Sequence, residues 1–367
     1  MNNNQFHIDF KLNGNSFLSV DDLLLYANSL SIHTQQFLQE WFSKSTMIAV
    51  KTSGSTGVPK TIQLKKEFMI NSALATGHFF GALEKTTALL CMSTQYIAGK
   101  MMLVRALVLG WHMDCITPAA SPLEELAKTY DFSAMVPMQL QNSLADLHKV
   151  KILLVGGGAV HIELERKLDQ ITTQVFATFG MTETISHVAV KPLNHMASLG
   201  EKAQKEFIAH ENPTAINPVY DASFYTTLPD VTISQDERGC LVIHATKVSE
   251  KKIITNDVVS IISDTEFQWL GRIDHVINSG GIKIHPEAVE KKLAVRIPQR
   301  FFVAGIPDQL LGEKLVLLVE GEQSEINLND LSGLSKYELP KQIYFVQKFV
   351  ETETKKIQRS ATLDLIL

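Results

Sequence analysis

The sequence contains few cysteines, little excess charge and no long uninterrupted apolar run. Its three cysteines, Cys91, Cys115 and Cys240, are odd in number, far apart and not in a metal-ligand spacing, which argues against a disulfide framework or a cysteine-based zinc site. They indicate reduced thiols in a reducing compartment. The formal net charge of −5 does not fit a nucleic-acid surface, which is usually basic.

The most apolar region, residues 88–113, is interrupted by Lys100 and Arg105. This region therefore suits a buried strand and helix better than a membrane span. The N-terminal MNNNQFHIDF lacks the basic segment followed by an apolar segment that a signal peptide has. We expect a cytoplasmic protein with no membrane span and no nucleic-acid partner.

The length of 367 residues suggests roughly two or three domains. In the first half, short apolar runs alternate with helix-length segments such as SPLEELAKTY and HIELERKLDQI. This alternation favours a mainly parallel sheet with helices on both faces. The apolar runs are MIAV (47–50), TALLCM (87–92), CITP (115–118), FSAMVP (132–137), KILLVGG (151–157) and QVFATFG (174–180).

The second half has a different pattern. From about residue 213, short β-type runs predict an antiparallel, barrel-like subdomain. Beyond Asp274, a glycine pair, a helix beginning at Pro286 and three strand runs predict a small α+β domain. The predicted fold class is therefore α/β, with a large N-terminal domain over residues 1–273 and a small α+β domain over residues 274–367.

Residues 52–61, TSGSTGVPKT, are rich in glycine and hydroxyl groups and contain a lysine. Such a segment can bind phosphate through backbone N–H groups and a point charge. Gly54, Lys60 and Thr61 match the P-loop pattern G-x-x-x-x-G-K-[ST], but Pro59 stands where that pattern needs glycine. Proline removes an N–H donor and fixes φ, so the Walker-type loop is excluded, while an ordinary solvated turn remains an alternative.

The stretch TSGSTGVPK resembles the phosphate loop of the adenylate-forming enzymes, which include acyl-CoA synthetases, luciferases and the adenylation domains of peptide synthetases. Members of that family end this loop in Pro-Lys. The resemblance implies that the loop closes over the β- and γ-phosphates of ATP, which leave as pyrophosphate. The implicated residues are Thr52, Ser53, Gly54, Ser55, Thr56, Gly57 and Lys60.

Two further motifs resemble the nucleotide site of the same family. FATFGMTET (176–184) implies Glu183, together with Thr56, as ligands of Mg²⁺, an ion that prefers oxygen ligands, and Thr182 as a contact of the α-phosphate. VGGGAV (155–160) resembles the loop that lies against adenine and the acyl group, although a strand-to-helix glycine turn explains it equally well. The other residues implied at the nucleotide are Gly157, Gly158, Ala159, Thr178, Phe179, Gly180 and Met181.

Asn256-Asp257 occupies the place of a Gly-Asp pair, between two strand runs, and Gly271-Arg272-Ile273-Asp274 matches a Gly-Arg-x-Asp motif. The resemblance implies that Asp257 binds the ribose hydroxyls and that Arg272 reaches the ribose or phosphate. Asp274 is implied as the hinge about which the small domain turns between two half-reactions.

ETETKKIQRS (351–360) resembles the family pattern Pro-x-Thr-x-x-Gly-Lys-Ile-x-Arg. Aligning Ile357 and Arg359 makes Lys356 the lysine that bridges the carboxylate and α-phosphate, with Lys355 as the alternative. A carboxylate and a triphosphate repel each other, so the site must supply positive charge where they meet. The small domain is then expected to withdraw Lys356 and present Ser279, Gly280 and Gly281 to coenzyme A.

Fewer residues precede the phosphate loop here than in typical members, and INSGGIKIHPEAVE most resembles members that activate o-succinylbenzoate for menaquinone synthesis. That acid has two carboxylates, so a second cation is expected. Lys100 is the first candidate and Arg105 the second, while a snorkelling lysine is the structural alternative. Thr184, Ser186 and His187 are further candidates for the acyl pocket.

Three alternatives remain open at this point. The acid can be another aryl or short-chain acid, or the acceptor a carrier-protein thiol. The chain can also be a non-catalytic nucleotide-binding homologue, given Val350 and Lys355 where the family has proline and glycine. The expected ligands are a small carboxylic acid, Mg²⁺, ATP and coenzyme A, and a homo-oligomer is compatible with the sequence.

Overall fold

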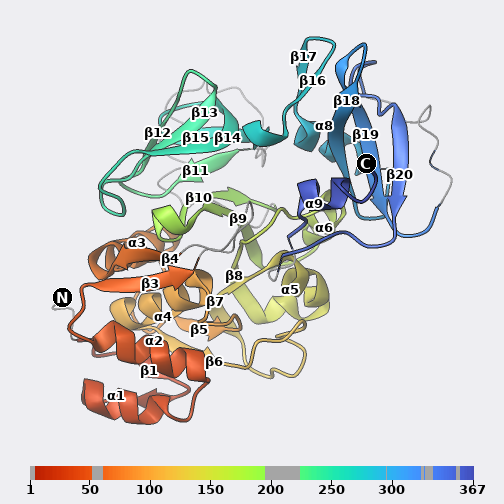
Figure 1. The fold of residues 1–367 in the computed structure, drawn as a ribbon. Coiled ribbons are helices and arrows are strands. Elements are labelled where there is room, and N and C mark those ends of the chain that lie inside the picture. The colour runs from red at the N-terminus through yellow and green to blue at the C-terminus, as the bar shows by residue number, and fades with distance from the viewer. Residues whose placement is uncertain are drawn as a thin grey trace, which may run out of the picture.

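The computed structural model describes residues 5–51, 61–194, 224–294, 296–323, 326, 334–352 and 356–367. These residues form one large sheet, one small sheet and a two-stranded ribbon (Figure 1). Among the described residues, no helix is long and apolar enough to cross a membrane.

The centre of the large sheet is parallel, as the alternating runs predict. Its strands, in spatial order, are β9 (Gln174–Gly180), β8 (Val150–Val155), β7 (Tyr130–Met135), β5 (Thr87–Leu90), β6 (His112–Cys115) and β1 (Lys11–Leu12), with the antiparallel β2 (Asn15–Ser16) at the edge. Alternate residues of one strand enter different cores: Leu154 lies in one apolar cluster, and Leu153 and Val155 lie in the other.

Helices cover both faces of this parallel centre. One cluster includes residues of α3 (Lys66–Phe80) and α4 (Ile97–Leu109), and the other includes residues of α5 (Pro137–Asn142), the 3-10 helix η1 (Leu144–Lys149) and α6 (Ile162–Leu168). Gly81 and Gly110 end α3 and α4 with φ of 62° and 73°, a left-handed conformation that glycine adopts without steric cost. The fold class predicted from the sequence is confirmed.

The antiparallel strands continue the same sheet beyond β9 and, among the described residues, do not close into a barrel. Their order is β10 (His187–Pro192), β11 (Tyr225–Thr227), β15 (Glu266–Arg272), β14 (Ile253–Ile261), β13 (Cys240–His244) and β12 (Thr232–Gln235). Asn256 and Asp257 therefore lie inside β14, not between two strands, because KKIITN and VVSIIS belong to one continuous strand with a register shift after Val258.

Two other predictions were wrong. Among the described residues, MIAV is not part of the parallel sheet: β3 (Met47–Lys51) pairs with β4 (Thr61–Lys65) in an antiparallel ribbon. SPLEELAKTY forms turns and not a helix. Leu123 of this segment is fully buried. A segment of this length is only marginally stable as a helix unless more of its side chains pack against the core.

The N-terminal segment adds two helices to the α3–α4 face. They are α1 (Val20–Ala27) and α2 (Ile32–Phe42), each capped by a serine side chain, Ser19 and Ser31. Phe37, Leu38 and Trp41 of α2 are buried in the same apolar cluster as α4.

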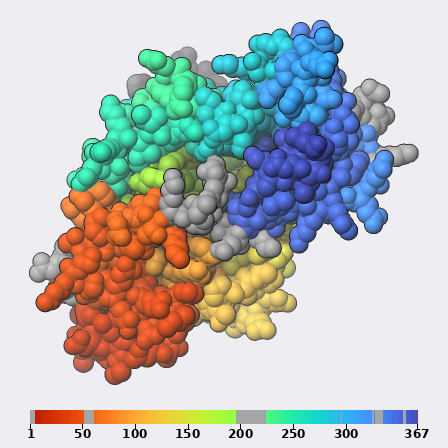
Figure 2. All heavy atoms as spheres, viewed as in Figure 1, coloured from red at the N-terminus to blue at the C-terminus, as the bar shows by residue number. Residues whose placement is uncertain are grey.

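The small sheet has its own strands and cores. It contains β17 (Ile282–Ile284), β16 (Ile277–Ser279), β19 (Gly312–Glu320), β18 (Phe301–Asp308) and β20 (Gln342–Val346), with α8 (Pro286–Leu293) and α9 (Arg359–Leu363) packed beside it. Figure 2 shows this part, in cyan to blue, lying against the green and cyan surface formed by the antiparallel strands of the large sheet. The chain passes between the sheets through the 3-10 helix η3 (Ile273–His275).

Gly99 holds α4 close to the preceding loop, which fixes the helix that carries Lys100 and Arg105. A Cβ at this position would overlap the carbonyl oxygen of Ser93. Gly99→Ala is therefore expected to lower the free energy of unfolding by roughly 1–3 kcal/mol, the usual cost of overpacking. Urea unfolding measures it, with Ala98→Ser at the exposed neighbouring position as the control; equal stabilities of the two variants would contradict the packing argument.

Candidate functional site

The motifs that follow β8 and β9 meet at the carboxyl ends of these two parallel strands, where open α/β sheets bind ligands. The hydroxyl of Thr178 donates a hydrogen bond to the carbonyl of Val155 at 3.1 Å. A side chain on Gly156 would meet that hydroxyl. Gly157, Gly158 and Ala159 are exposed beside it, so backbone is accessible at this edge.

Gly180 and Met181 connect β9 to η2 (Thr182–Thr184). Gly180 has no room for a Cβ because the carbonyl of Ser186 lies against it. Glu183 is exposed, and no described residue pairs with its carboxylate. Free carboxylate and hydroxyl oxygens at Glu183 and Thr182 suit a hard cation such as Mg²⁺.

A strained γ-turn follows η2. Ile185 has φ 68° and ψ −59°, and the N–H of Ser186 donates to the carbonyl of Thr184 at 2.8 Å. A positive φ is unusual for a β-branched residue, and this type of γ-turn is rare. The hydroxyl of Thr184 is buried and bonded to the backbone of Met181 and Ser186, so it stabilises the turn.

The γ-turn directs Ser186 and His187 toward Arg105 of α4. Arg105 is 3% exposed, and its Nη2 lies 3.1 Å from Ser186 Oγ and 3.4 Å from His187 Nδ1. Ser186 Oγ also bonds Ser72 Oγ of α3 at 2.8 Å. No described carboxylate forms an ion pair with Arg105, and its Nε has no described partner. Burial lowers the pKa of Arg105 to about 10.

His187 must be neutral in this environment. Burial, followed by the charge of Arg105, lowers the pKa of His187 well below its ordinary value. Because the guanidinium can only donate, His187 Nδ1 accepts and Nε2 carries the proton. That Nε2–H is buried and has no partner among the described residues. Arg105 Nε and His187 Nε2 are thus two unused donors in one buried cluster.

Lys100 points elsewhere. Its side chain is also buried, but the ammonium lies 4.6 Å from the centre of the Phe37 ring on α2. Burial lowers the pKa of Lys100, and the charge of Glu40, also on α2, opposes this shift. The two cations predicted for the acyl pocket therefore have different neighbours.

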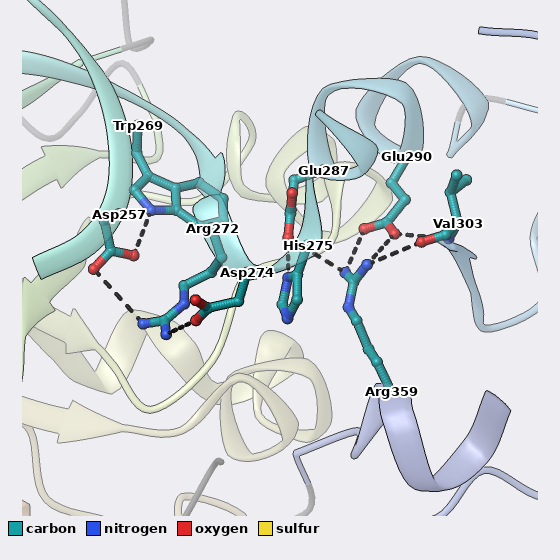
Figure 3. Close-up of polar contacts among 9 residues, drawn as sticks. All are labelled: Asp257, Trp269, Arg272, Asp274, His275, Glu287, Glu290, Val303 and Arg359. Carbon is teal, nitrogen blue, oxygen red and sulfur yellow. Dashed lines mark hydrogen bonds and ion pairs between the residues drawn. The ribbon is translucent and has the colours of Figure 1, made fainter. Parts of the chain in front are cut away.

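Asp257 and Arg272 face each other across β14 and β15, as Figure 3 shows. Asp257 Oδ2 lies 4.0 Å from Arg272 Nη1, and Arg272 Nη2 contacts Asp274 at 2.5 Å. Asp274 also accepts from Asn256 Nδ2 at 3.0 Å. Sequence reasoning missed Trp269, whose Nε1–H donates to Asp257 Oδ1 at 2.9 Å. Burial raises the pKa of Asp257, against that hydrogen bond.

Phe179, predicted beside adenine, packs edge-on against Phe267 and Tyr225 with centroid separations of 5.2 and 5.6 Å. This aromatic cluster fixes the strand end that carries Gly180. Phe179 is half-buried and packs against the larger apolar cluster of the large sheet.

The phosphate loop from Thr52 to Lys60 lies outside the described residues, as does Lys355. The ends of that loop are held together because Lys51 pairs with Thr61 in the β3–β4 ribbon.

Lys356 is described and half-buried, and burial lowers its pKa. Its N–H donates to Thr352 Oγ1 at 3.1 Å, and Glu351 bridges Ile357. In contrast, Gly280 and Gly281 are exposed in the β16–β17 turn, and Ser279 is buried. Figure 1 shows that turn at the top of the molecule, away from β9, and α9 on the side of the small sheet nearer to α6.

A family model described as AMP-binding enzyme matches residues 19–208, just over half of the chain. The chain belongs to the AMP-binding enzyme family. An acyl-CoA synthetase (AMP-forming)/AMP-acid ligase II-like protein from Dyadobacter fermentans is 36% identical, with a TM-score of 0.57, over 91% of this chain and 94% of that structure.

Other members of the family cover most of the chain at lower identity. The 2-succinylbenzoate–CoA ligase of Listeria monocytogenes is 25% identical in an alignment that covers 89% of this chain and 71% of the relative. The o-succinylbenzoate CoA synthetase of Bacillus subtilis in complex with ATP and magnesium ion has a TM-score of 0.67 at 18% identity, over 95% of this chain and 82% of that one. The latter likeness shows the fold alone.

The depressed pKa of His187 predicts loss of stability in acid. The unfolded chain takes up a proton near the ordinary histidine pKa and the folded chain does not, so stability is present above that pKa and falls as the pH decreases below it. We expect His187→Gln to reduce the pH dependence of the free energy of unfolding between pH 7 and 5 by up to about 1.4 kcal/mol per pH unit. Urea unfolding at several pH values measures this, and parallel curves for the parent and the variant would show that His187 takes up its proton at the same pH in the folded and the unfolded chain, which would contradict the lowered pKa.

Proposed function

We propose that this AMP-forming acid–CoA ligase activates o-succinylbenzoate, forming o-succinylbenzoyl-CoA, AMP and pyrophosphate as in menaquinone synthesis. The proposal goes beyond family membership in naming the acid. It is supported by the curated ligases of that name, which are about 25% identical over most of the chain, and by one feature of the described structure, the buried Arg105.

The choice of acid rests on one observation, the buried guanidinium of Arg105, which has no carboxylate partner among the described residues. A guanidinium buried without a carboxylate is costly unless a ligand compensates it. A dicarboxylic acid brings one carboxylate to the ATP and leaves the other free, and that free group matches the donors of Arg105 and His187 Nε2. We therefore favour Arg105 over Lys100 as the cation of the acyl pocket, since the ammonium of Lys100 is already stacked on Phe37.

For the nucleotide, we propose that Asp257 and Arg272 bind the ribose and adjacent phosphate, and that Gly157–Ala159 and Thr178–Met181 surround the adenine. The neutralising groups at the phosphates would be Lys60 and the hydroxyls of the loop that contains Thr52. Glu183, with Thr56, would hold Mg²⁺, which neutralises phosphate charge and so favours pyrophosphate departure.

Lys356 would bring the acid carboxylate to the α-phosphate. Their mutual repulsion is the main electrostatic barrier, and a preorganised ammonium group stabilises the charge that accumulates as they meet. Partial burial strengthens this interaction because water screens it less. The small domain over 274–367 would then turn about Asp274 and bring Gly280 and Gly281 to the thiol of coenzyme A, which attacks the activated carbonyl and releases AMP.

The first test measures pyrophosphate release with Mg·ATP, coenzyme A and four acids: o-succinylbenzoate, benzoate, a medium-chain fatty acid and acetate. We expect strong preference for o-succinylbenzoate and loss of multiple turnover in Lys356→Ala, with Lys341→Ala on the exposed start of the β20 segment as the control. Preference for another acid would refute the substrate assignment. ATP binding without release for any acid would favour a non-catalytic homologue.

The second test separates the two candidate cations. Arg105→Gln should raise the KM for o-succinylbenzoate roughly 10- to 100-fold, the value of a hydrogen bond to a charged group. It should have little effect on benzoylpropionate, the same keto acid without the ring carboxylate. Lys100→Ala serves as the matched variant and should leave both KM values nearly unchanged. The opposite pattern would assign the second carboxylate to Lys100.

A further inference from the structure

Glu287, in the first turn of α8, is buried at the boundary between the two sheets. Its side chain is 10% exposed, and Oε1 lies 2.5 Å from His275 Nδ1 of η3. Oε2 lies against the backbone of Gly271 in β15, so closely that a Cβ on Gly271 would overlap it. The contact between Glu287 and Gly271 therefore joins the small sheet's helix to the large sheet across position 274.

Burying a carboxylate at this contact costs desolvation free energy that an apolar side chain packed in the same place would not cost. A buried carboxylate needs hydrogen bonds to both oxygens, yet Oε2 has no partner among the described residues. Although burial opposes it, the hydrogen bond from His275 and the charge of Arg359, 4.0 Å away, hold the pKa of Glu287 below its usual range. Glu287 thus remains ionised at the joint.

The same face of α8 also holds the segment that contains Lys356. Glu290 lies one turn after Glu287 and accepts both ends of the Arg359 guanidinium, at 2.7 and 2.8 Å (Figure 3). Arg359 Nη1 also donates to the carbonyl of Val303 at 3.2 Å. Since Arg359 is three residues after Lys356, α8 connects the strand of Arg272 with the loop of the proposed catalytic lysine.

We propose that Glu287 is a positioning residue: with His275, it fixes α8 against Gly271 and so holds Lys356 in the orientation used for adenylate formation. The proposal rests on the function proposed above. We assign the described arrangement of the small sheet to adenylate formation because Lys356 is half-buried. Gly280 and Gly281, proposed to meet coenzyme A in the second step, are exposed to solvent. Turning about Asp274 for thioester formation must separate Glu287 from Gly271.

A distance measurement tests the contact without any acid. Spin labels are placed at Leu310 and Ile262, which are 94% and 52% exposed on the small and large sheets. Pulsed electron resonance should give one dominant distance in the parent and a broader or shifted distribution in Glu287→Gln, which keeps the shape and removes the charge. His275→Gln should act in the same direction. Unchanged distributions in both variants would overturn the proposal.

Half-reaction kinetics test the role. In Glu287→Gln, acid-dependent ATP–pyrophosphate exchange should fall about tenfold, a typical coupling, while transfer from supplied acyl adenylate to coenzyme A stays at the parental rate or rises. Equal losses in both steps would reveal a general structural role and overturn the proposal.

The control is Glu338→Gln, which removes a 2.7 Å ion pair with Lys292 inside the small domain and should change neither the exchange nor the label distance. If the parent protein shows no ATP–pyrophosphate exchange with any of the acids, the proposed function fails. The distances between the spin labels then still decide whether Glu287 fixes α8 against Gly271.

Discussion

The buried guanidinium of Arg105, which forms no ion pair with a carboxylate of the described residues, constrains how α4 packs against the turn that follows η2. Arg105 can remain charged between α4 and β10 only if its neighbours offer acceptors and no positive charge. Ser186 and a neutral His187 meet that condition. They reach Arg105 only because Ile185 adopts a strained γ-turn. The strain, the lowered pKa of His187 and the buried hydroxyl of Thr184 are therefore parts of one local arrangement, and strain of this kind is typical of functional sites.

Much of the fold was predictable from the sequence because its parallel centre has a strong signal. Short apolar runs followed by helical segments leave few topologies other than a covered parallel sheet. The errors occurred where local pattern and tertiary context disagree. MIAV has the composition of a core strand, yet in the described part of the chain it pairs with β4 and not with the large sheet. SPLEELAKTY has two leucines at helical spacing, but the burial of Leu123 in a turn determines its conformation.

The site was predictable to the extent that its chemistry is concentrated in contiguous motifs. Asp257 and Arg272 were identified separately, and the structure brings them within 4.0 Å, although their roles at the nucleotide stay predictions. Trp269 escaped notice because an indole in a strand has the appearance of a core residue, and only the cross-strand register brings it to Asp257. Ser72 and Glu287 have no local sequence signal at all, since their partners lie elsewhere in the chain, at Ser186 for Ser72 and at His275 and Gly271 for Glu287.

The division of the apolar cores has a further consequence. Among the described residues, two clusters lie within the large sheet and its helices, and two others lie within the small sheet and its helices. At the joint, Arg272 and Asp274 form a largely exposed ion pair, which contributes little stability, and Glu287 lies against the backbone of Gly271. In the part of the chain that the structure describes, no apolar cluster is shared by the two parts, so little couples their unfolding. Calorimetry of the free protein should therefore resolve two melting events. A ligand held by both parts at once would merge them, because its binding free energy is lost when either part unfolds.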